Sequence, residues 1–509
     1  MKSLSSRALA LTVPLSMFCG TAMADLTPTE VWGDWRDYLQ SMGYSLNASE
    51  SVSGGDLTVS DITLSYAMPD DGSMAVDLGT ILFQQNRDGT VAIVLPDAMP
   101  ITITGRDANA GGEMTTMVMN YLQAGQTLTA SGDLQEMTYL YKADTVAMTL
   151  EDMQVGDKTV GRDEARIAFS GSNVSATTTM TVAEARGYSQ SGSVEGASFD
   201  IFFVDQEVAT TRAAIKGDMS GITFDGTGTI PLDMPEGADM AQMLAAGFDV
   251  LGSFAYTSGS STVDVADPES GNYVMSTSSD GGTLAVKMAP DGLGYSGQQQ
   301  NVKVGVTVEG MPFPFEIAMA ESGFNLQMPV SQSEEPQDFA FGLTLGDFTM
   351  SDIIWSTFDP TGQLPRDPAT IMLDLAGKAR LLVDWLNPEA AGQMTGPPGQ
   401  LEALTLNTIV VDAAGARLDG SGAVTIDTAG APLVPGVGTP VGDVNLALSG
   451  GNALLDKLVA MGLLPQDQAM GARMMMGLFA VPGDAPDTLK SNIQFTEGGQ
   501  ILANGQRIR

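Results

Sequence analysis

The chain has 509 residues, and its 23 Lys and Arg against 61 Asp and Glu give a net charge of −38 at pH 7. It contains no histidine, and its single cysteine is Cys19. Those absences exclude Ser-His-Asp and Cys-His catalysis, zinc sites of His and Cys, haem held by histidine, and iron–sulfur clusters. The acidic charge disfavours docking to nucleic acid or to anionic lipid headgroups. We therefore predict no catalytic residue, no metal and no cofactor.

The first 24 residues have the pattern of a cleaved secretory signal peptide. Lys2 and Arg7 flank the start of an apolar run over residues 8–18, and a small-residue site at 22–24 precedes Asp25. The run is shorter than the roughly 20 residues that a spanning helix needs. We predict a periplasmic protein without a membrane span after cleavage, carrying 21 basic and 61 acidic residues and a net charge of −40.

A helix is expected near 28–42, directly after the signal peptide. Thr27 and Glu30 have the spacing of a capping box, and Pro28 suits the first helical position. Trp32 and Trp35 share one face, and packing of this face on a following sheet is favoured over a membrane-surface helix, because the opposite face has no basic stripe.

The period of the apolar residues then changes from helical to two. Apolar and polar residues alternate in short segments separated by turn residues, which predicts antiparallel strands. The segments are 57–64, 75–83, 91–95, 101–104, 128–150, 165–170, 199–204, 273–288, 302–308 and 339–345. The expected fold is therefore mainly β, with elongated antiparallel sheets and a few short amphipathic helices packed on them.

Three further helical regions are predicted from apolar residues spaced three and four apart. They lie near 113–123, near 237–251, and as a pair near 452–479. In the last of these, Met470, Met474 and Leu478 are expected to form a packed apolar face. Most of the 31 methionines are interpreted as packing residues rather than copper ligands, because they occupy positions where leucine would fall.

The chain is expected to divide into two β-rich halves, 25–260 and 261–509. The segment 259–267, rich in Ser and Gly, and the segment 331–336 are the predicted linkers. A similar ten-residue pattern occurs at 224–233 and at 418–427. It indicates either an internal duplication or two similar Asp-Gly turns that enter strands.

One loop, 355–368, combines aromatic, basic and proline residues. Three prolines stiffen it, and Arg366 lies between Asp359 and Asp367, which is typical of a rigid connector closed by ion pairs. The alternative is a recognition loop in which Trp355 and Arg366 contact a ligand. The strand after it is expected to alternate as far as Trp385, so Trp355, Arg366 and Trp385 are the candidate binding residues. An apolar strand face of that length must be covered by helices or by a ligand.

Several segments resemble a known family of exported Gram-negative bacterial proteins, domain of unknown function 2125. These are TPTEVWGDWRDYLQSMGY, LPRDPATIMLDLAGKARLL, LEALTLNTIVVDAAGARLDGSGAVTID and GGNALLDKLVAMGLLP with ILANGQRI. The family has no assigned activity, so the resemblance implies no site residue. The strands and two-helix insert after Leu401 are also similar to AsmA-like envelope proteins. That second resemblance implies long sheets with apolar grooves involved in lipid movement.

The sequence thus favours a non-enzymatic periplasmic β protein that binds an apolar, lipid-like ligand or an envelope partner. A purely structural scaffold with closed sheets is the first alternative. A hydrolase that uses two carboxylates is the second, since its acids come together only in the fold. An open apolar groove would favour binding, and a filled core would favour a scaffold.

Overall fold

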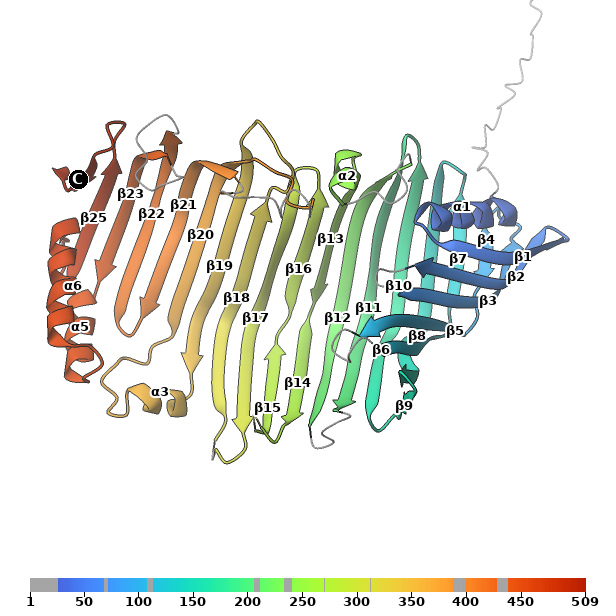
Figure 1. The fold of residues 1–509 in the computed structure, drawn as a ribbon, viewed down its shortest axis with the longest axis horizontal. Coiled ribbons are helices and arrows are strands. Elements are labelled where there is room, and N and C mark those ends of the chain that lie inside the picture. Colours follow the sequence, from blue (N-terminus) through green and yellow to red (C-terminus); the bar gives the residue numbers. More distant parts are fainter. Residues whose placement is uncertain are drawn as a thin grey trace, which may run out of the picture.

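In the part of the chain that the structure describes, 27 strands form one long antiparallel sheet, accompanied by five short helices (Figure 1). The computed structural model describes residues 26–67, 72–107, 113–205, 211–232, 240–269, 271–311, 313–387, 397, 399–427 and 438–509. The expected mainly β fold, with an elongated antiparallel sheet and few short helices, is confirmed.

The strands follow one another across the sheet largely in chain order, as hairpins and meanders do. The N-terminal strands are β1 (Ser45–Ser53), β2 (Asp56–Ala67), β3 (Ser73–Gln85), β4 (Val91–Val94), β5 (Ala98–Asp107), β6 (Glu113–Ala124), β7 (Thr127–Gly132), β8 (Glu136–Val155) and β9 (Lys158–Val160). The central strands are β10 (Ala165–Val182), β11 (Ala185–Val204), β12 (Arg212–Pro231), β13 (Asp249–Tyr256), β14 (Ser258–Ala266), β15 (Tyr273–Ser279), β16 (Gly282–Ala289), β17 (Gly292–Val308), β18 (Phe315–Met328) and β19 (Gln337–Met350). The C-terminal strands are β20 (Ala369–Leu381), β21 (Gly399–Ala413), β22 (Ala416–Asp427), β23 (Thr439–Ser449), β24 (Val481–Pro482), β25 (Thr488–Phe495), β26 (Ile501–Ala503) and β27 (Gln506–Arg507).

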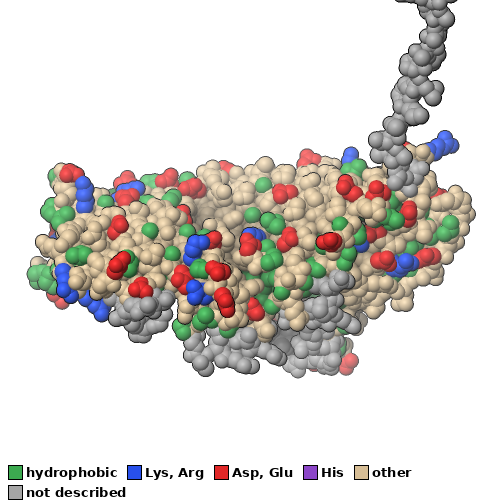
Figure 2. Space-filling view, turned by 90° about the horizontal axis from the view of Figure 1, so that it is seen from above, with side chains coloured by type: hydrophobic (Ala, Val, Ile, Leu, Met, Phe, Trp, Pro, Cys, Tyr) green, Lys and Arg blue, Asp and Glu red, His purple; other side chains and the backbone are tan. Residues whose placement is uncertain are grey.

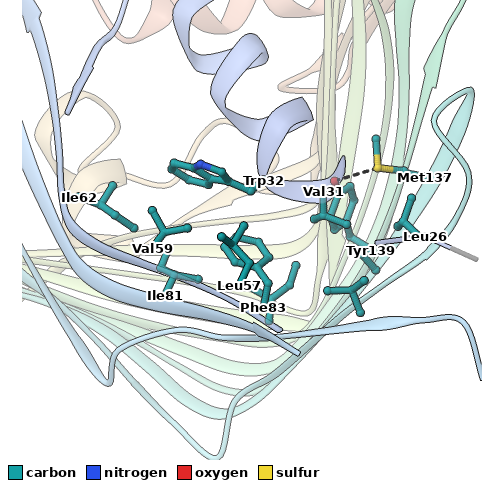
Figure 3. Packing of buried hydrophobic residues seen from close by; sticks show 13 residues of the cluster. Leu26, Val31, Trp32, Leu57, Val59, Ile62, Ile81, Phe83, Met137 and Tyr139 are labelled. Carbon is teal, nitrogen blue, oxygen red and sulfur yellow. Dashed lines mark hydrogen bonds between the residues drawn. The ribbon is translucent and has the colours of Figure 1, made fainter. Parts of the chain in front are cut away.

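Helix α1 (Pro28–Ser41) begins where the capping box predicts. The Thr27 hydroxyl accepts a hydrogen bond from the Glu30 N–H at 3.3 Å, and the Glu30 carboxylate accepts one from the Thr27 N–H at 2.9 Å. Trp32 is fully buried against Phe83 of β3, as Figure 3 shows, so the expected packing of this helix face on the sheet is confirmed. This N-terminal cluster is the best-buried apolar core of the described residues.

Helices α5 (Gly451–Ala460) and α6 (Gln466–Phe479) form the predicted pair at the opposite end of the sheet (Figure 1). The interpretation of the α6 methionines as core residues is wrong for three of the four, since Met475 is also half exposed. Met470 and Met474 are 66% and 72% exposed, and Leu478 of the same stripe is 55% exposed. The opposite side of α6, with Met476 and Phe479, faces the sheet, because the helix lies across its last strands.

The helix expected near 113–123 is wrong, because these residues form strand β6. Its apolar residues at 114, 117, 118, 121 and 122 fit a helical stripe, but β6 pairs with β5 on one side and β8 on the other. Thr115, Thr116 and Val118 are β-branched and favour the strand. The apolar pattern alone fits either a helix or a strand, and pairing with β5 and β8 decides for the strand.

The helix expected near 237–251 is much shorter, since α2 spans Met240–Ala245 and β13 begins at Asp249. The chain reverses at Gly247, whose φ of 96° suits glycine. The segment 259–267 is strand β14 over most of its length rather than a linker, and it pairs with β12 and β15. One sheet therefore crosses the expected division at residues 260 and 261.

The Asp-Gly pairs of the two similar ten-residue patterns lie inside strands rather than in turns. Asp225 and Gly226 belong to β12, and Asp419 and Gly420 belong to β22. The expectation that they are turn residues is wrong. Whether the two patterns reflect a duplication stays a prediction.

Candidate binding trough

The long strands separate apolar and polar side chains onto opposite faces of the sheet. In β20, for example, Leu373 and Leu375 point to one face, and Asp374 between them points to the other, because side chains alternate along a strand. The register aligns these positions from strand to strand. One row crosses ten successive strands from β12 to β23, through Phe224, Phe254, Leu284, Gly297, Phe324, Leu343, Leu373, Ile409, Gly420 and Leu446. We call the surface that contains this row the apolar face.

A line of left-handed residues keeps both halves of the long strands on the same face. Asn173, Gly221, Asn301 and Asp347 have φ between 48° and 59°. In β12, apolar side chains fall at 213, 215 and 219 but then at 222 and 224, so the alternation shifts by one residue at Gly221. A slip of one residue would otherwise turn half of each strand over. The left-handed residue keeps the apolar side chains of both halves of the strand on one face, as a β-bulge does.

The geometry around Asn173 shows the effect directly. A Cβ placed on Gly171 would lie 3.1 Å from a Val146 methyl, 3.4 Å from one of Val194 and 3.6 Å from one of Val174. Residues 171 and 174, on either side of the irregular residue, therefore share a face. Bulges also increase the local bend of a strand. Figure 3 shows the sheet bending around α1, with Trp32 and Phe83 on its inner side.

Aromatic rings on the apolar face lie over glycines of the neighbouring strand. Phe224 faces Gly192, Phe199 faces Gly217, Tyr188 faces Gly228, Phe324 faces Gly297, and Phe339 faces Gly377 in the strand register. A Cβ on Gly297 would lie 2.8 Å from Cε1 of Phe324, so only glycine leaves room for the ring. Rings that lie along the sheet in this way cover the glycine backbone and give a smooth apolar lining.

The apolar face is lined but not filled in its central part. Phe324 is 45% exposed, Phe341 and Ile371 are each 41% exposed, and Tyr295 is 37% exposed. Near α1 the residues of the same face are fully buried, because the helix covers them. Helix α1 lies on it near one end of the sheet, and α6 covers it near the other end. We call the region between them, from β12 to β22, the trough.

An apolar cavity of about 340 Å³ lies where α6 meets the end of the trough. Its lining comes from three strands and the helix: Leu418, Leu446, Leu448, Met475, Met476, Phe479, Ala480, Leu489, Lys490, Ser491 and Ile493. The apolar lining therefore continues underneath the helix.

In the strands away from α1, ion pairs lie on the opposite, outer face. Asp200 accepts from Arg166 at 3.0 Å and lies 3.5 Å from Lys216. Burial alone would raise the pKa of Asp200, but these two cations hold it below its usual value. Lys378 pairs in the same way with Asp338 at 2.7 Å. Figure 2 shows acidic and basic side chains interspersed over one face of the molecule, so the negative charge on that face is not gathered in one block.

A buried ion pair fixes α1 to the sheet at the N-terminal end of the apolar face. Arg186 of β11 donates to Asp34 of α1 at 2.7 Å, and both side chains are more than nine-tenths buried. The Arg186 guanidinium also lies 5.3 Å from the centre of the Tyr38 ring, a cation–π distance. Nearby, Trp35 donates to the Tyr139 hydroxyl at 3.0 Å, and burial raises the pKa of Tyr139. These contacts fasten the helix that closes this end.

The structure brings together two of the three predicted binding residues. Helix α3 (Asp352–Phe358) carries Trp355, and the Arg366 guanidinium lies 5.6 Å from the Trp355 ring centre. Arg366 pairs with Asp352, not with the neighbours expected from the sequence. Trp385 lies beyond the far end of β20, about 40 Å of extended chain away, and it is 45% exposed. The three residues do not form one site.

The loop that contains Arg366 is held by Asp359. Its carboxylate is buried and accepts hydrogen bonds from the N–H groups of Gln363 and Leu364, each at 2.9 Å. Burial would raise the pKa of Asp359, but these N–H groups and Arg366 hold it below its usual value. This geometry matches the interpretation of the loop as a rigid connector.

Sequence reasoning missed the line of left-handed residues and the aromatic–glycine pairs. Both left a signal in the sequence. The shift of alternation recurs in several long strands, and a glycine stands where an apolar residue is due. Only the strand register shows that these positions are neighbours.

Among the described residues, no helix is long and apolar enough to cross a membrane, and no group of three or more acidic side chains could hold a metal ion. No family model, curated protein or solved structure matches the chain. The residues and their geometry therefore carry the functional argument.

Proposed function

We propose that this chain is an exported, non-enzymatic protein that holds an apolar, lipid-like ligand in the trough. The observation that carries the proposal is the partly exposed apolar lining that continues across ten strands. Large exposed apolar patches on proteins mark binding sites. A scaffold would be expected to bury the same residues, as the N-terminal cluster does.

The dimensions of the trough suit acyl chains. The row from Phe224 to Leu446 crosses nine strand-to-strand steps, and at about 4.8 Å per step it is roughly 43 Å long. An extended acyl chain spans about half of the roughly 30 Å hydrocarbon core of a bilayer. More than one such chain fits end to end along the row.

Charge favours a ligand with a neutral or cationic polar part. The net charge of −38 repels anions, and the row itself has no charged side chain. Binding energy therefore comes from apolar contact, at about 25 cal/mol for each Å² of apolar surface removed from water. Periplasmic location and the resemblances to envelope families agree with such a ligand and are part of the proposal.

The test is native mass spectrometry of the purified protein after incubation with a lipid extract of a Gram-negative envelope. The decisive variants are Phe324→Asp and Asn325→Asp. They add the same carboxylate at adjacent positions of β18, the first inside the trough and the second on the outer face. We expect lipid adducts on the parent and on Asn325→Asp, and at least a tenfold loss of adduct on Phe324→Asp, which is about 1.4 kcal/mol.

Two results would contradict the proposal. Parent protein that carries no lipid at any extract concentration would favour the scaffold. Equal loss of adduct in both Asp variants would place the lipid outside the trough. Folding of each variant is checked by circular dichroism, and both positions are exposed enough to tolerate the change.

A further inference from the structure

The two ends of the sheet differ in whether the edge strand is covered. At the C-terminal end, β25 is covered on its free side by β24 and β26, and Pro482 interrupts β24. At the N-terminal end, β1 pairs only with β2 among the described residues. Eight of the nine β1 residues are exposed, and Val52 is 65% exposed. Figure 1 places β1 at the opposite end from α5 and α6.

An open edge strand can pair with another chain unless it is blocked. Natural edge strands are usually short, or carry lysine, proline or an inward charge. Strand β1, with the sequence SLNASESVS, is nine residues long and has neither lysine nor proline. Its one charge, Glu50, is held on the inner face by the Trp32 indole N–H at 2.7 Å and by Arg36 at 3.3 Å. This edge therefore lacks lysine and proline, and the inward charge of Glu50 is compensated by Arg36 within the same copy.

The residue pattern of β1 is nearly symmetric about Ser49. Antiparallel pairing of two copies about this residue would place Ser49 opposite Ser49, Ala48 opposite Glu50, and Leu46 opposite Val52. Leu46, Glu50 and Val52 all belong to the apolar face, because they pair with Leu64, Val59 and Leu57 of β2. The odd-numbered residues, all serine or asparagine, would form a polar ladder on the outer face. No like charges would face each other.

We infer that β1 is a homodimerisation edge, at which two copies pair antiparallel about Ser49 and join their sheets into one. A two-fold interface brings the same strand from both copies together, and a symmetric strand is what such an interface requires. The apolar pairs between Leu46 and Val52 extend the apolar face across the junction. This inference does not depend on what the trough binds.

The paired strands alone make a small interface, below the roughly 1,000 Å² of a stable one. The dimer is therefore expected to dissociate in the micromolar range. Each copy has a net charge of −38, so added salt should strengthen the dimer by screening the repulsion.

The near absence of cysteine allows a direct test of the register. In a Cys19→Ser background the chain has no thiol, and Ser49→Cys places two thiols opposite each other on the symmetry axis. Directly opposed residues in antiparallel strands have Cα atoms about 4.5–5.5 Å apart, within the range of a disulfide. Mild oxidation at micromolar concentration is expected to yield a covalent dimer.

The matched control is Ser51→Cys, which lies on the same outer face. In the proposed register its two copies are four residues apart along the strand, about 13 Å, so no disulfide should form. Mixing Ser51→Cys with Asn47→Cys brings the thiols opposite each other and should restore cross-linking. Equal cross-linking of Ser49→Cys and Ser51→Cys alone, or none in any combination, would overturn the inference.

Sedimentation of uncross-linked protein gives an independent measurement. Ser49→Lys sets two lysines opposite each other and should raise the dimer dissociation constant at least tenfold, because like charges directly opposite destabilise strand pairing. Ser49→Glu should act in the same way. An equimolar mixture of the two variants should dimerise again. A parent that is monomeric at all concentrations, or a mixture that stays monomeric, would refute the pairing about Ser49.

Discussion

Gly377→Ala tests the arrangement in which aromatic rings lie over glycines. A Cβ at this position would lie 2.5 Å from the Ala403 carbonyl oxygen and 2.6 Å from Cε1 of Phe339. Ordinary carbon–oxygen contacts are about 3.3–3.6 Å, so something must move by almost 1 Å. The ring can swing away, but the oxygen belongs to the backbone of β21 and can move only with the strand pairing.

The expected destabilisation is about 2 kcal/mol, within the range for overpacked sites. Urea unfolding followed by circular dichroism measures it as a lower midpoint. The control is Gly252→Ala on the same apolar face, where the nearest atom to the added Cβ is 3.9 Å away. Removing glycine freedom at a site with room should leave stability unchanged or raise it slightly. In a Phe339→Ala background the cost of Gly377→Ala should fall without vanishing, since the clash with Ala403 remains.

If Gly377→Ala unfolds at the same urea concentration as Gly252→Ala, the ring does not lie on the glycine. If the cost is unchanged in the Phe339→Ala background, only the backbone contact matters. Either result would refute the account of the smooth lining given for the trough.

Three further predictions follow from other parts of the molecule. Asp34→Ala should destabilise the protein by about 3–5 kcal/mol and increase hydrogen exchange in α1, because it leaves buried Arg186 without its partner. The double variant Asp34→Ala with Arg186→Met should recover much of this stability. No recovery would contradict the assignment of the loss to the buried ion pair. Asp487→Asn should cost about 1 kcal/mol at pH 7, since the carboxylate accepts from the N–H groups of Asn452 and Ala453 at the start of α5. Burial alone would raise the pKa of Asp487, but those groups hold it below its usual value. The stabilisation is therefore complete above about pH 4 and is lost as the pH falls through the lowered pKa; a difference in urea midpoints that does not narrow as the pH is lowered below about 4 would contradict this. The affinity for monoacylglycerols, measured by calorimetry, should increase about twofold for each CH₂ added to the acyl chain. Full burial contributes about 0.8 kcal/mol per CH₂, and an open trough covers about half of each chain. An affinity that is independent of chain length would exclude the trough as the site.

Much of the local structure follows from the residues alone. The capping box at Thr27 and Glu30 fixes where α1 begins, because it satisfies N–H groups within a single turn. Alternation with a period of two marks the strands, since side chains on a strand point to opposite faces whatever the partner is. The helix pair that ends at Phe479 is likewise predicted by residues that are close together in the sequence. The absence of histidine and the presence of only one cysteine exclude whole classes of catalysis without any structure.

Other features were decided by contacts between distant parts of the chain. Residues 113–123 satisfy a helical stripe, yet they form β6, because β5 and β8 offer hydrogen-bonding partners on both sides. Met474 fits the pattern of a core residue, but an apolar stripe is buried only where another element packs on it. No described element covers the stripe of α6 that contains Met474. The candidate residues Trp355 and Trp385 lie at opposite ends of β20, so the strand between them keeps them apart.

The sequence by itself determined that this is an antiparallel β protein with one apolar face to cover. The tertiary structure decided that the face stays partly open. Openness depends on the strand register, which sets rings over glycines such as Gly297, and on left-handed residues such as Gly221 and Asn301 within the long strands. Register is a property of pairs of strands, so the sequence of any single strand does not contain it.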